Sequence, residues 1–173
     1  MKPKSGIFTN ILFLIIGVLL GAFASWIISN HFYRESTEDK KRALIESAIH
    51  EIQLNITHDM YSEYRDTAQY RTAGRGLSYL QVGALHQLYL NIGIFKYSNS
   101  PLFADFEENL IRAKISVEIF NQFVEFRNNY ILEHIKSSIV FDPTIFQQYN
   151  NRVLPSIKRL KEFLIRNKES LVK

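Results

Sequence analysis

One short segment, residues 127–134 (RNNYILEH), carries residue types that can do chemistry. Arg127 and His134 stand seven positions apart, so on a helix they point the same way, about 10 Å apart along the axis. A guanidinium holds a scissile phosphate through its fork of donors, and a histidine that titrates near neutral pH moves protons to or from the 2′-oxygen and the leaving group. One such pair makes a poor site alone, but two helices meeting in a dimer would bring two pairs together for RNA cleavage without a metal.

An ordinary interpretation of the same residues stays open. Arg127 can pair with Glu125 or Glu133, and His134 can cap the helix end or face water, because charged residues on helices are usually solvated. Other catalytic patterns are missing: the chain has no Cys, no GxSxG, no HExxH and no Glu-x-x-His pair. One helix face groups Glu51, Asn55, His58 and Asp59, but such faces usually make i,i+4 pairs or meet water. We therefore expect neither a metal nor a cofactor.

Residues 7–28 (IFTNILFLIIGVLLGAFASWII) contain no charged side chain. As a helix this run is roughly 33 Å long, enough to cross a hydrocarbon core of about 30 Å. Near the end of the run and just after it, an interfacial belt is expected from Trp26, His31, Phe32 and Tyr33. Two other interpretations are a secretory signal cleaved near Ala24 and a buried core helix. The length of the run and its continuation through Ile28 favour an uncleaved membrane span.

The basic residues on either side of the span bear on its orientation. Lys2 and Lys4 precede it, whereas four basic residues follow within about 15 positions. These four are Arg34, Lys40, Lys41 and Arg42. Counting only Lys and Arg, as the positive-inside rule requires, favours a single-pass protein whose remaining chain is cytoplasmic.

Small residues recur every four positions in the span, at Gly17, Gly21 and Ser25. On a helix they form one stripe, which allows two spans to approach closely and gain dispersion contacts. The alternative is that these residues are simply small and have no partner. The stripe predicts homo-oligomerisation in the bilayer.

The chain after the span has the apolar spacing of helices. The longest apolar stripe consists of Phe106, Leu110, Ala113, Val117, Phe120, Val124, Ile131 and Ile135. The last segment is expected to place on one face Ile157, Leu160, Phe163 and Leu164. Few Gly and Pro residues and no alternating strand pattern predict an all-α bundle of four to five helices. We predict helices over 37–71, 77–94 and 101–138, another that starts at Asp142-Pro143, and a break or kink at Pro155 before the last segment. The predicted division is an N-terminal flank (1–6), a transmembrane helix (7–28), a linker (29–36) and a helical domain (37–173).

The C-terminal segment is basic. Residues 151–173 hold 7 basic and 2 acidic side chains. The polar face of its helix is expected to carry Lys158, Arg159, Lys161, Arg166 and Lys168. These cations can bind anionic lipid headgroups or RNA phosphates, or they can form a solvated face.

Arg127, Asn128 and His134 fit the pattern R-x(4–6)-H, with an Asn directly after the Arg, inside a small helical bundle. In this the chain resembles the HEPN superfamily, with the motif at the long end of the spacing. The family's typical activity is metal-independent RNA cleavage by a dimer, and its members are common in bacterial defence and toxin systems. The resemblance implies the same site residues here.

The single N-terminal span sharpens this resemblance. A HEPN-like domain on one transmembrane helix is similar to the membrane-anchored accessory proteins of type VI-B CRISPR systems, which accompany an RNA-guided RNase. That similarity implies a homo-oligomer that perturbs the bacterial inner membrane during phage defence, and it leaves RNA cleavage by this chain open. Two alternatives stay open: a membrane-tethered ribonuclease that uses Arg127 and His134, and a periplasmic sensor or scaffold bundle.

Overall fold

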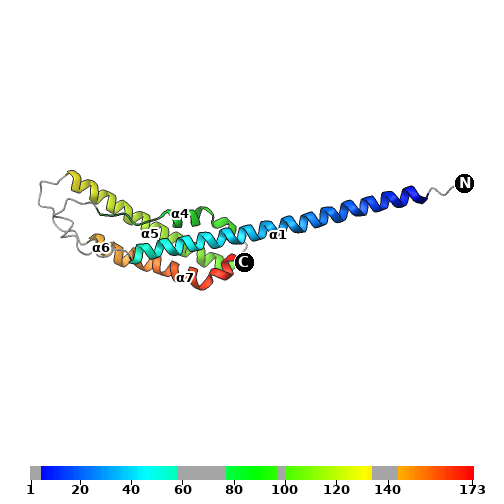
Figure 1. Cartoon of the computed structure of the whole chain (residues 1–173). Coiled ribbons are helices and arrows are strands. Elements are labelled where there is room, and N and C mark those ends of the chain that lie inside the picture. The colour runs from blue at the N-terminus through cyan, green and yellow to red at the C-terminus, as the bar shows by residue number, and fades with distance from the viewer. Residues whose placement is uncertain (1–4, 58–76, 97–99, 134–143) are drawn as a thin grey trace. The chain divides into compact units, whose positions relative to one another are not determined.

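The computed structural model describes residues 5–57, 77–96, 100–133 and 144–173. These residues form helices and no strand, which confirms the predicted all-α class (Figure 1). The α-helices are α1 (Ser5–Thr57), α4 (Gly83–Leu90), α5 (Ser100–Glu133), α6 (Thr144–Gln148) and α7 (Leu154–Val172). Two further elements are the 3-10 helix η1 (Ile92–Phe95) and the π-helix η2 (Tyr149–Val153). The chain divides into two compact units, Met1–Lys40 and Lys41–Lys173.

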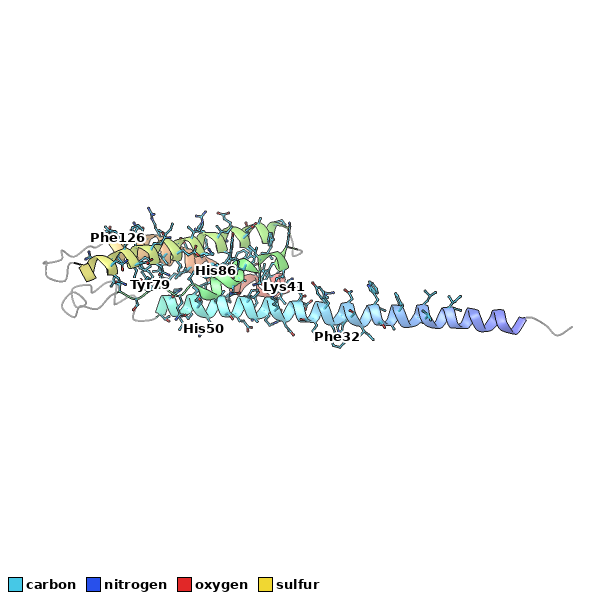
Figure 2. All side chains as sticks on the ribbon, turned by 90° about the horizontal axis from the view of Figure 1, so that it is seen from above. Phe32, Lys41, His50, Tyr79, His86 and Phe126 are labelled. Atoms are coloured by element: carbon cyan, nitrogen blue, oxygen red, sulfur yellow. The ribbon has the colours of Figure 1, made fainter. Side chains whose placement is uncertain are left out.

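The first unit holds the apolar part of α1. From Ile15 onward this helix is long and apolar enough, by length and composition, to cross a membrane, and its apolar window is not buried. Trp26 is 62% exposed and Phe32 is 65% exposed. Figure 2 shows the side chain of Phe32 projecting away from the helix. Side chains of this kind need lipid or another apolar surface as a partner.

The sequence predicts a linker over 29–36 and a new helix from 37, but α1 runs through both without a break. Residues 29–36 contain no Gly or Pro, so nothing in this stretch interrupts the helical backbone. Thr37 donates its hydroxyl to the Tyr33 carbonyl (2.8 Å) instead of capping a new helix. Arg34 Nε donates to Glu38 Oε1 at 3.0 Å. The predicted continuation to residue 71 lies outside the described residues beyond Thr57.

In the second unit, the end of α1 runs antiparallel to α7. Lys41 Nζ donates to the Val172 carbonyl (3.1 Å), and one turn further along α1, Lys168 Nζ lies 2.5 Å from Glu46 Oε1. Near the other end of this contact Lys161 donates to Gln53. Three polar contacts in this order fix the register between the two helices.

The core of this unit follows the predicted apolar stripe of α5. Six residues of the stripe are at most 1% exposed: Phe106, Leu110, Ala113, Val117, Phe120 and Val124. They pack with α7, which buries Ile157, Leu160 and Leu164 as the sequence predicts, and with Ile45 and Ile52 of α1. The last two residues of the predicted stripe, Ile131 and Ile135, lie outside the described side chains.

The predicted helix over 77–94 is wrong in its first third. Residues 77–82 are not helical, and α4 starts only at Gly83. The backbone of these residues is bonded by side chains from α1 and α5, described below, which removes the need for a helical hydrogen-bond ladder. An added Cβ at Gly83 would lie 3.6 Å from Glu51 Oε2 of α1, an ordinary van der Waals distance.

Pro155 lies in the first turn of α7, directly after the π-helix η2. Proline has no N–H to donate to the carbonyl four residues earlier, and its ring clashes with that carbonyl. A widened π turn at this point lets the chain continue from α6 through η2 into α7. The predicted break at Pro155 is therefore a change of helix type, and the predicted start at Asp142-Pro143 lies outside the described residues.

We predict that Tyr149→Phe lowers the free energy of unfolding by about 1–2 kcal/mol, because it removes a buried hydrogen bond. Tyr149 is fully buried and donates its hydroxyl to the Asn55 carbonyl of α1 at 2.7 Å. Denaturant unfolding of the detergent-solubilised chain, followed by far-UV circular dichroism, measures the loss. Tyr79→Phe is the control, since Tyr79 is 48% exposed. Equal effects of the two variants would contradict the assignment.

Candidate functional site

The long helix α5 carries the first two residues of the predicted motif. Arg127 and Asn128 are both half-buried, six and five residues before the end of α5 at Glu133. His134 lies outside the described residues, so the predicted distance between the guanidinium and the imidazole stays a prediction.

Asn128 is used by the fold. Its Nδ2 donates to the Leu77 carbonyl at 2.9 Å, and its Oδ1 accepts from the Leu77 N–H at 2.7 Å. An amide side chain offers the same donor and acceptor as a peptide group, so it can replace a neighbouring strand as the partner of an extended backbone. Both polar atoms of the Asn128 side chain are therefore used in bonding the backbone of Leu77.

Two further asparagines repeat this geometry. Asn121 of α5 bonds the N–H and the carbonyl of Leu80, both at 2.9 Å. Asn55 of α1, which is fully buried, bonds the N–H and the carbonyl of Gln81 at 2.9 and 2.8 Å. We call Asn55, Asn121 and Asn128 the asparagine clamp. The clamp holds the non-helical segment 77–82 through side chains of α1 and α5.

Glu51 continues this contact one turn earlier on α1. Its Oε2 accepts from the Ala84 N–H at 2.7 Å, and its Oε1 accepts from the Leu85 N–H at 3.0 Å. These N–H groups belong to the first turn of α4, which has no intrahelical partners for them and carries a partial positive charge. The carboxylate is 7% exposed and caps the helix from a distant part of the chain.

Two spacings are the signals in the sequence that could have indicated the clamp. Glu51 and Asn55 stand four apart, and Asn121 and Asn128 stand seven apart, so each pair shares a helix face. We grouped Glu51 and Asn55 with His58 and Asp59 as one polar face, and the latter two lie outside the described residues. Within the described chain, Glu51 and Asn55 accept hydrogen bonds from backbone N–H groups.

The five basic residues expected on the polar face of the C-terminal helix divide into two groups. Lys161 and Lys168 face α1, where they contact Gln53 and Glu46. Lys158, Arg159 and Arg166 are exposed on α7 and remain available to an anionic surface. The hydrogen bond and the charge of Lys168 lower the pKa of the Glu46 carboxyl below its ordinary value.

The small-residue stripe of the span presents an open face. A Cβ built at Gly17 or at Gly21 would meet no atom within 4 Å, and Ser25 is exposed. A second helix can therefore approach the backbone there. No family model, curated protein or solved structure matches the chain.

We predict that Asn128→Ala lowers the free energy of unfolding by about 1–3 kcal/mol, because two backbone groups of Leu77 lose their partner. Hydrogen–deuterium exchange should also become faster in the peptide that contains residues 77–82. The control is Asn129→Ala, which removes the same side chain at the adjacent, exposed position. If both variants exchange like the parent, the clamp does not hold this segment.

The lowered pKa of Glu46 predicts a pH dependence. The folded chain favours the charged carboxylate, so this contribution to stability is present above the ordinary pKa of 4.5 and is lost as the pH falls through the lower folded value. Unfolding measured from about pH 6 down to about pH 3 should therefore show a smaller acid loss in Glu46→Gln than in the parent. Lys168→Met should show the same reduction, and exposed Glu162→Gln should not. An unchanged profile in both pair variants would contradict the prediction.

Proposed function

We propose that this chain is a single-pass membrane effector of bacterial antiviral defence. In this proposal it oligomerises, perturbs the inner membrane alongside an RNA-guided RNase, and keeps its HEPN-like bundle in the cytoplasm. The observation that carries the proposal is an apolar helix that exposes its large side chains, on a chain whose following residues have a core of their own. The resemblance of residues 127–134 to the HEPN motif supplies the link to defence.

The open stripe of Gly17 and Gly21 supports the oligomer. Association of spans in lipid depends on packing and not on the hydrophobic effect, because lipid tails are as apolar as the helix surface. Close backbone approach is therefore the main source of attraction, and it requires small residues without neighbours. Gly17 and Gly21 meet this requirement among the described residues.

The asparagine clamp favours an effector over the ribonuclease alternative. A catalytic Asn beside the Arg would have to turn its amide toward RNA, whereas the amide of Asn128 is bonded to both backbone groups of Leu77. Freeing it would leave an N–H and a carbonyl of the clamped segment unpaired, which costs about 1–3 kcal/mol. Arg127 and His134 alone would then have to carry any cleavage.

We expect the detergent-solubilised chain to have the mass of a closed oligomer by light scattering, and to release dye from liposomes. The double variant Gly17→Leu/Gly21→Leu should weaken association and dye release by about tenfold or more, since ~1.4 kcal/mol of lost packing suffices for this. Ala22→Leu is the matched control, because it adds the same side chain away from the stripe.

Two outcomes would contradict the proposal. A monomer that releases no dye would exclude the membrane-effector role. A dimer that cleaves RNA without a metal, and loses cleavage in both Arg127→Ala and His134→Ala, would instead support the tethered ribonuclease.

A further inference from the structure

A groove with a high positive charge lies between α5 and the start of α7. It has a volume of about 310 Å³ and is lined by Arg112, Ser116, Asn151, Arg152, Pro155, Ser156 and Arg159. Three of these residues carry a guanidinium, and none of the described residues that line the groove is acidic. The groove thus combines permanent positive charge with neutral polar groups.

Two helix faces bring these residues together. Arg152, Ser156 and Arg159 follow one another at steps of four and three, which places them on one face where η2 continues into α7. Arg112 and Ser116 stand four apart on α5 and face them. The hydroxyl oxygens of Ser116 and Ser156 lie 3.3 Å apart, which marks the contact between the two faces.

The charge of the groove is only partly compensated. Arg112 pairs with Glu108 through Nη2 and Oε1 at 2.7 Å. Arg152 and Arg159 are exposed, and neither has an ion-pair partner in the described part of the chain. Guanidinium groups are weakly hydrated and bind phosphate oxygens in a planar, bidentate way. A phosphate-bearing ligand is therefore the anion that this geometry suits.

An apolar pocket adjoins the groove and shares two of its residues, Ser116 and Arg152. It has a volume of about 120 Å³, and its other lining residues are Ile119, Phe120, Phe123, Gln148 and Val153. The ring of Phe123 is 44% exposed and can stack on a planar ligand. The two compartments together offer a cationic site next to an aromatic one.

The π-helix η2 explains how the compartments come to be neighbours. Arg152 and Val153 are its last two residues, and they line the groove and the pocket respectively. A π turn displaces side chains from the ordinary helical positions, and such turns are frequent at functional sites. Pro155 accounts for the turn itself, while the placement of Arg152 and Val153 is its consequence.

We propose that this site binds a nucleotide, with its phosphates on Arg152, Arg159 and Arg112 and its base in the apolar pocket against Phe123. The inference goes beyond the proposed membrane role and does not depend on it, because every residue used lies in the helical unit after Lys40. A soluble nucleotide bound here would give a membrane effector a ligand that reports the state of the cell.

The test is a titration of the full chain, in neutral detergent, with ATP that carries a fluorophore on its ribose. Unlabelled ATP, pyrophosphate and adenosine then compete with the probe. Arg152→Gln/Arg159→Gln should weaken ATP binding by about tenfold or more, because two charge-assisted contacts are lost. Arg166→Gln is the matched control and should change it by less than about twofold, since it removes an exposed charge of α7 outside the groove. Phe123→Ser should weaken ATP but not pyrophosphate.

The proposal is overturned if the chain does not bind ATP, or if Arg166→Gln weakens binding as much as the double variant. Pyrophosphate that competes as well as ATP would show a simple anion site without a base pocket. Vesicles of phosphatidylglycerol that bind through Arg152 and Arg159, while ATP does not compete, would assign the groove to a lipid headgroup and also overturn the nucleotide. None of these readouts depends on oligomer mass or dye release.

Discussion

The backbone of residues 77–82 needs hydrogen-bond partners that neither a helix nor a sheet provides. Side chains of the helical unit supply these partners, and the positions of its helices depend on them. Asn55 from α1 and Asn121 and Asn128 from α5 supply them in pairs. Because an unpaired buried peptide group costs about 1–3 kcal/mol, each of the three side chains contributes to holding this segment in place. The clamp thereby fixes the distance between α1 and α5, and Glu51 fixes where α4 begins.

Polar contacts between α1 and α7 fix the register of these two helices. An apolar stripe alone allows two helices to slide by one turn, since the next set of apolar residues fits almost as well. Lys41 is 5% exposed and must place its ammonium on the Val172 carbonyl and near the Phe95 ring, so a shift by one turn would bury an unpaired charge. This cost selects one register, and Lys168 with Glu46 repeats the selection near the surface.

Local signals in the sequence predicted the parts of this fold that depend on local physics. The buried stripe of α5, the start of that helix beside Pro101 and the disturbance at Pro155 all follow from spacing or from proline geometry. The clamp could not be predicted, because its bonds join residues 26 to 51 positions apart and asparagine has no single structural role. Likewise, nothing local distinguishes Lys161 and Lys168, which face α1, from exposed Lys158. For the candidate site, the sequence placed Arg127 and Asn128 on one long helix. It did not indicate that Asn128 bonds the backbone of Leu77.

The helical period places Asn128 and Arg127 on different faces of α5. Asn121 and Asn128 are seven apart and share the face of α5 that holds residues 77–82. Arg112, Ser116, Ile119 and Phe123 recur at steps of four, three and four along another face, roughly half a turn away, and Arg127 is the next position of that series. Arg127 and Asn128, which are neighbours in the motif, point about 100° apart around the helix axis and so belong to different faces of α5. Asn128 can hold the fold while Arg127 lies on the side that carries the arginine-lined groove, so structural and ligand-binding demands on α5 do not compete.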